Sequence, residues 1–93
     1  MSKKKLDKHI NDFLYAYLEC NDEFNHLDDT DKLYVYSVLK KLLALIHKVL
    51  KYPNVYPILL VQNSKSKKII EKAFEEVAPV IPTINNIKIT VMN

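Results

Sequence analysis

The 93-residue chain contains no glycine. Loops that wrap closely around a phosphate, such as the P-loop and the dinucleotide-binding fingerprint, need glycine because a Cβ would keep the backbone away from the anion. The composition therefore excludes nucleotide-binding enzymes of these two classes. All fourteen basic residues are lysine, and without the planar fork of arginine a sequence-specific reading of DNA is disfavoured as well.

Length and composition predict one folded domain, residues 1–93. Apolar residues make up 48% of the chain and charged residues 27%, a balance typical of globular proteins. The single cysteine, Cys20, cannot form an intramolecular disulfide. No apolar segment follows the first lysines as in a signal peptide, and none reaches the roughly 20 residues that span a bilayer. We therefore expect a cytoplasmic, intracellular location and no membrane contact.

Two apolar patterns with a period of three to four predict two N-terminal helices. The first covers roughly residues 3–20, and the second begins near residue 30 and ends before Pro53, whose ring cannot continue a helix. Residues 21–30 are polar and acidic, which predicts a loop whose last residues, Asp28 to Thr30, cap the second helix. The second helix has the broader apolar stripe, which indicates contact with more than one element.

The last forty residues predict a strand–helix–strand unit. Residues 55–62 are rich in valine, leucine, isoleucine and tyrosine, which is typical of a buried strand, and Pro57 limits that strand to an edge or makes Pro57 one of its first residues. Helical spacing returns from Asn63 and ends before Pro79, and residues 84–92 alternate like a strand with one wet face. We predict an α+β domain of order ααβαβ. The alternative is an all-α bundle in which residues 55–62 join the third helix.

A sheet of only two strands is marginal by itself. We therefore expect either that the second helix covers one face of the sheet or that a second chain extends its edge. The helical crossover between the strands implies that they are parallel, either adjacent or with one strand between them.

No catalytic or metal-binding pattern stands on its own. The acidic segment 21–31 lacks the alternate ligands, the glycine and the final glutamate of a calcium loop, and His26 with one cysteine is too few for a zinc site. No serine or cysteine forms a recognisable nucleophile setting with a histidine. Packing roles suit Cys20 and His47 better. We expect no enzyme activity, no cofactor and no metal.

The candidate binding site lies in and around ILLVQNSKSKK, residues 58–68. This segment runs from an apolar strand into the start of a helix, which Asn63 or Ser64 caps. A helix N-terminus attracts anions, and with lysines beside it an acidic peptide suits it better than a nucleotide. The candidate residues are Tyr56, Asn63, Ser64, Lys65, Lys67 and Lys68.

These features favour a non-enzymatic interaction module with a protein partner, either an acidic peptide or protein surface or a second copy of the chain. Exposed tyrosines would anchor such a contact.

One alternative is a lysine-driven nucleic-acid binder with weak sequence preference. It rests on residues 32–51, which contain five lysines and no acid, and on Lys3, Lys4, Lys5 and Lys8. The net charge of only +3 disfavours it. A second alternative, a helical protein like the bacteriocin immunity proteins, rests on size and composition and requires the all-α fold.

Within LLALIHKVLKYPNVYPILLVQN, residues 42–63, a helix leads through a Pro-Asn turn and a tyrosine to alternating apolar residues and an asparagine. The relevant positions are Pro53, Asn54, Tyr56, Leu59, Val61 and Asn63. This segment, about a quarter of the chain, resembles the helix-to-strand passage of PUB (PUG) domains. The resemblance implies a small adaptor that binds the C-terminal tail of an AAA ATPase.

Overall fold

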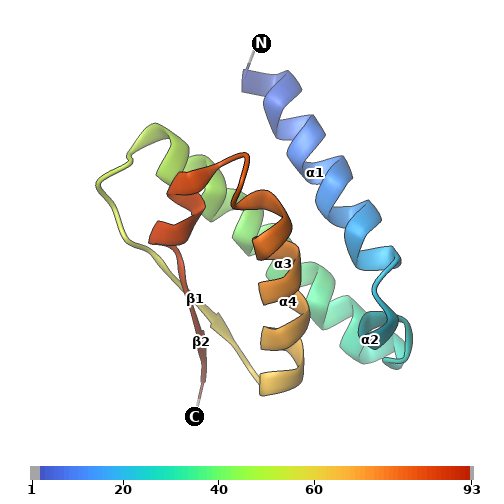
Figure 1. Cartoon of the computed structure of the whole chain (residues 1–93). Helices are drawn as coiled ribbons and strands as arrows, with labels where there is room; N and C mark the ends of the chain where they lie inside the picture. Colours follow the sequence, from blue (N-terminus) through green and yellow to red (C-terminus); the bar gives the residue numbers. More distant parts are fainter. Residues whose placement is uncertain (1–2, 93) are drawn as a thin grey trace.

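The computed structural model has the order helix, helix, strand, helix, strand, with short helical turns in two of the connections (Figure 1). It describes residues 3–92, with side chains from residue 8 onward. The elements are α1 (Lys3–Glu19), α2 (Asp22–Asn25), α3 (Asp29–Lys51), β1 (Ile58–Val61), α4 (Ser64–Val77), the 3₁₀-helix η1 (Pro82–Asn86) and β2 (Lys88–Val91). The fold is therefore α+β in the predicted order ααβαβ, and residues 58–61 form a strand instead of extending a helix.

Side-chain caps set the starts of the helices. The Asp28 carboxylate accepts a hydrogen bond from the Asp31 N–H (2.8 Å) at the start of α3. Asn21 caps α2 in the same way. The sequence predicted a loop over residues 21–30, and this part of the prediction was wrong, because the Asn21 cap and the burial of Phe24 stabilise one helical turn there.

The end of α3 explains how the chain turns without glycine. Pro53 and Asn54 form the predicted turn, in which the Val55 N–H donates to the Tyr52 carbonyl (3.2 Å). No residue in the described range has a positive φ angle. The turns therefore use backbone conformations that residues with a Cβ adopt readily.

The two strands lie side by side and run parallel, with α4 as the connection. The Lys88 N–H donates to the Pro57 carbonyl (2.9 Å), and the Met92 N–H donates to the Val61 carbonyl (2.7 Å). The second strand is shorter than its alternating pattern predicted, because residues 82–86 form η1 and bury Ile84 in the core.

Helices α3 and α4 form the middle of the molecule. Figure 1 shows α1 on one side of them and the two strands on the other. As expected, α3 contacts several elements, namely α1, α4, β1 and η1, and both α3 and α4 pack against the sheet. No helix within residues 3–92 is long and apolar enough to cross a membrane. The largest fully buried side chains are Leu14, Leu18, Val35, Val38, Leu39, Leu42, Ile46, Val49, Val61, Ile69, Ile70 and Ile84.

Candidate functional site

The predicted binding residues lie at opposite ends of β1. Tyr56 precedes the strand and is 73% exposed, whereas Asn63 and Ser64 follow the other end. An extended chain rises about 3.3 Å per residue, so Tyr56 and Asn63 are separated by roughly 20 Å. The structure therefore does not bring Tyr56 together with the start of α4.

The start of α4 is occupied in part by its own cap. The Asn63 Oδ1 accepts a hydrogen bond from the Ser66 N–H (2.8 Å), which identifies Asn63, one of the two predicted residues, as the cap. Ser64 and Lys65 are exposed in the first turn.

The other two predicted lysines of α4 point to different hollows. Lys67 lines a hollow beside β2 together with Glu71 and Glu75. Lys68 lines another, with Glu23 of α2 and the same two glutamates. The exposed part of α4 therefore carries charges of both signs and is not a uniform basic cluster.

The outer face of the sheet carries exposed apolar side chains. Ile58 is 60% exposed and Leu60 is 49% exposed, whereas Leu59 and Val61 face the core. The prediction of a buried strand was therefore wrong for one face of β1. Parallel sheets usually have both faces covered, so the open face of β1 is a candidate contact surface.

The backbone of β1 also has a free edge. The Pro57 and Val61 carbonyls face β2, so by strand alternation the N–H and C=O groups of Ile58 and Leu60 point away from it. The described residues supply no third strand on that side. At the end of the edge, the Gln62 N–H donates to the Tyr34 hydroxyl (2.7 Å). The edge is therefore open at Ile58 and Leu60 and closed at Gln62.

One stripe of α3 starts at the closed end of this edge, where Tyr34 contacts Gln62. Lys41 and Lys48 follow Tyr34 at intervals of seven residues, so these three residues lie on one side of the helix. Both lysines are exposed. The sequence contains no acidic residue from Lys32 to Ile70, a segment that includes nearly all of α3, the whole of β1 and the start of α4. The β1 edge, defined here as Ile58 and Leu60 with this α3 stripe, therefore combines apolar, hydrogen-bonding and basic groups.

The acid-free run of lysines and the candidate Tyr56 were predicted from the sequence, whereas the role of Tyr34 was not. The seven-residue spacing of Tyr34, Lys41 and Lys48 was visible in the sequence. The sequence does not show which side of α3 faces β1, because the apolar stripe of this helix is broad.

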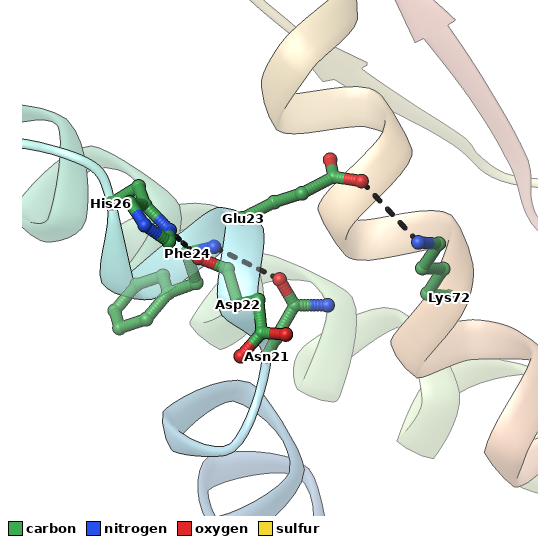
Figure 2. Close-up of polar contacts among 6 residues, drawn as sticks. All are labelled: Asn21, Asp22, Glu23, Phe24, His26 and Lys72. Atoms are coloured by element: carbon green, nitrogen blue, oxygen red, sulfur yellow. Dashed lines mark hydrogen bonds and ion pairs between the residues drawn. The ribbon is translucent and has the colours of Figure 1, made fainter.

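The acidic segment forms local contacts around α2 (Figure 2). The His26 Nδ1–H donates to the Asp22 carbonyl (2.6 Å), which can only accept. The Glu23 carboxylate reaches the Lys72 ammonium of α4 at 3.3 Å.

No group of three or more His, Cys, Asp or Glu residues in the described part of the chain is arranged to hold a metal ion. Cys20 is exposed at the end of α1, so the prediction that it packs as a small apolar residue was wrong.

Four of the six tyrosines, Tyr15, Tyr17, Tyr34 and Tyr36, pack against the core. Tyr15 and Tyr36 stack at a centroid distance of 5.6 Å, and Phe24 meets Tyr36 edge-on at 5.1 Å. Burial, followed by the nearby Glu19 carboxylate and the Tyr15 phenol, raises the pKa of Tyr36. Tyr56 remains exposed, which makes it an available anchor beside the β1 edge.

A further hollow, of about 550 Å³, lies between α1 and α4. Its lining is apolar apart from the exposed side chains of His9 and Glu76. The side chains of Lys3, Lys4 and Lys5, predicted as part of a basic surface, lie outside the described residues.

Comparisons of this chain with protein-family models, with curated proteins and with solved structures find no match. The proposals below therefore rest on the residues themselves.

Proposed function

We propose that this protein is a non-enzymatic interaction module that adds an extended acidic segment of a partner protein to the β1 edge. The observation that supports this proposal is the position of the open backbone groups of Ile58 and Leu60. The side chains of Ile58 and Leu60 are exposed on one face of the sheet. Tyr34, which shares a stripe of α3 with the exposed Lys41 and Lys48, contacts Gln62 at the end of the edge. Strand addition at such an edge supplies main-chain hydrogen bonds, and alternate side chains supply specificity.

The two sides of the edge define the chemistry of the segment. Side chains of an added strand alternate between the faces of the sheet. Those on the outer face lie beside Ile58 and Leu60, where apolar groups are favoured. Those on the other face point towards Lys41 and Lys48, where carboxylates are favoured. The partner segment therefore alternates apolar and acidic residues.

Tyr34 limits the length of the pairing. Its hydroxyl already accepts from the Gln62 N–H, so an added strand cannot use that amide without displacing the phenol. The phenolic proton remains able to donate to a carboxylate at this end. The exposed Ser64 and Lys65 of the predicted site lie just past Gln62 and extend the basic surroundings.

Peptide binding tests the proposal directly. A fluorescein-labelled ten-residue peptide with alternating valine and glutamate is titrated with the protein, and fluorescence anisotropy is followed. We expect binding that weakens as salt is raised, since screening reduces attraction between exposed charges. The matched peptide with lysine in place of glutamate is expected not to bind. Equal binding of both peptides, or of neither, would rule out an acidic segment at this edge.

Variants locate the binding surface. Lys41→Glu and Lys48→Glu each place a repulsive charge beside the edge, and we expect each to weaken binding by roughly fivefold to tenfold. Lys40→Glu is the matched control, since this exposed lysine lies about 100° further round α3. Leu60→Pro removes an outward N–H and is expected to abolish binding, whereas Leu60→Thr keeps it. Equal effects at positions 40 and 41 would contradict this location.

A lysine-driven nucleic-acid binder is the second candidate. The observation that favours it is the exposure of Lys40, Lys41, Lys48 and Lys51 along α3. Random single- and double-stranded oligonucleotides, titrated at low and moderate salt, test it. Steeply salt-dependent binding that Lys40→Glu and Lys41→Glu weaken alike would support this candidate over the peptide.

A further inference from the structure

The second strand has a free edge of its own. The N–H groups of Lys88 and Met92 point towards β1. By alternation, the N–H and C=O groups of Ile89 and Val91 point to the opposite side, where the described residues supply no further strand. The sheet is therefore open on both sides, and the two edges differ in their surroundings.

The β2 edge lies beside a hollow of about 250 Å³ between the strand and α4. Phe74, Ile87 and Ile89 give the hollow an apolar lining, and Lys67, Glu71 and Glu75 add charges of both signs. A uniformly acidic strand placed here would be repelled by Glu71 and Glu75, and a uniformly basic strand would be repelled by Lys67. The charges of this edge therefore favour an occupant that itself carries both signs.

We infer that the occupant is β2 of a second copy, paired antiparallel about a two-fold axis through Thr90. In this register, the outward backbone groups of Ile89 bond to those of Val91 in the second copy, and Thr90 faces its own counterpart. Lys88 lies opposite Met92, so the lysines do not face one another. The two sheets then join into one sheet with the strand order β1-β2-β2-β1.

The same axis makes the flanking helices complementary. A two-fold axis sets α4 antiparallel to its copy beneath the joined sheet. Lys67 and Glu71 share a hollow with Ile89, next to Thr90, so this part of α4 lies near the axis. Each Lys67 then lies opposite Glu71 of the second copy. A closed two-fold contact of this kind uses one self-complementary surface on both subunits. It also converts a marginal two-stranded sheet into a four-stranded one.

This inference does not depend on the proposed peptide binding, because it uses the other edge of the sheet. In the resulting dimer both β1 edges remain at the outside, free for a partner.

Charge complementation between variants tests the inference. Sedimentation velocity or light scattering from micromolar to sub-millimolar concentration is expected to show the wild-type chain at twice its monomer mass. Lys67→Glu and Glu71→Lys each place like charges across the axis and are expected to be monomeric. A mixture of these two variants restores opposite charges across the axis and is expected to form heterodimers. A monomeric wild-type chain, dimeric single variants or a mixture that stays monomeric would each overturn the inference.

Proline variants separate the two edges. Val91→Pro removes an outward N–H of β2 without removing an N–H that bonds to β1, a position where strands tolerate proline. We expect it to lose dimerisation and keep peptide binding. Leu60→Pro is expected to keep dimerisation and lose peptide binding, since it blocks only the β1 edge. Circular dichroism shows whether each variant is folded. A folded Val91→Pro variant that remains dimeric would exclude pairing through β2.

Discussion

At the scale of single residues, Asn63 shows how a candidate binding residue can have a structural role. It stands where β1 ends and α4 begins, and its Oδ1 accepts from the Ser66 N–H at 2.8 Å. The first amides of a helix have no partner within the helix, so an oxygen at this position satisfies one of them. The same side chain cannot bind a ligand through this oxygen without competing with the cap.

We expect Asn63→Ala to lower the free energy of unfolding by about 1 kcal/mol, because the Ser66 N–H loses its acceptor. Asn63→Asp keeps a capping oxygen and is expected to change stability little. Urea unfolding measures both, with the exposed neighbour Ser64→Ala as control. If Asn63→Ala were as stable as the wild-type chain, the cap would have no energetic role.

The environment of Tyr36 couples stability to pH. Burial, Glu19 and Tyr15 raise the pKa of its phenol above the ordinary value, so at high pH the folded state holds this proton more tightly than the unfolded state. Since the folded state then binds more protons, stability falls as pH rises above about 10, where a tyrosine in the unfolded chain ionises.

We therefore expect the free energy of unfolding to decrease more steeply above pH 10 in the wild-type chain than in Tyr36→Phe, because phenylalanine has no proton to lose. Urea unfolding at a series of pH values gives this difference, and Tyr56→Phe at an exposed position is the matched control. Identical slopes for the wild-type and Tyr36→Phe chains would show that the Tyr36 phenol titrates normally.

At the scale of elements, α2 illustrates which contacts hold a short helix in place. The Phe24 side chain of α2 is buried against the core and contacts the ring of Tyr36. Another of its tertiary contacts, between Glu23 and Lys72, is an exposed ion pair. Burial of an aromatic ring contributes far more than an exposed ion pair does.

We expect Phe24→Ala to cost about 3 to 5 kcal/mol, since it leaves a cavity beneath α2. Lys72→Met, which keeps the length of the side chain and removes its charge, is expected to cost under about 0.5 kcal/mol. Thermal or urea unfolding compares the two variants. A larger effect of Lys72→Met than of Phe24→Ala would mean that the ion pair holds α2.

At the scale of the whole molecule, the C-terminal connection closes the core. In η1, Ile84 is fully buried, and the Asn86 side chain donates to the Pro53 carbonyl (2.8 Å) at the end of α3. These contacts join residues about thirty positions apart and deliver β2 to its place beside β1. Because β1 and β2 pair as a parallel sheet, the all-α alternative was wrong, and the analogy to immunity proteins, which required it, loses its basis.

We expect Ile84→Ala to cost about 2 to 5 kcal/mol, a large share of the stability of a small domain, because the side chain fills the space between α3 and η1. Val80→Ala, in the same connection but 79% exposed, is expected to change stability by under about 0.5 kcal/mol. Urea unfolding of both variants checks this contrast. Similar losses for the two variants would contradict the role of η1 in the core.

The sequence by itself determined the features that depend on neighbouring residues. The spacing of apolar residues, the caps at Asp28 and Asn63 and the stop at Pro53 are local signals, so the order ααβαβ and most boundaries were predicted. The turn at Asn54 was predicted for the same reason. The α2 turn was missed because its stability depends on where Phe24 packs.

Only the tertiary structure decided which surfaces face each other. Tyr34 and Gln62 are 28 residues apart in the chain, and their hydrogen bond exists only because α3 packs with one side along β1. The same packing leaves Ile58 and Leu60 exposed, and the length of β1 keeps Tyr56 away from Lys65. A residue pattern records the period of a strand or helix but not the partner that covers each face, so the two open edges became visible only once the elements were assembled.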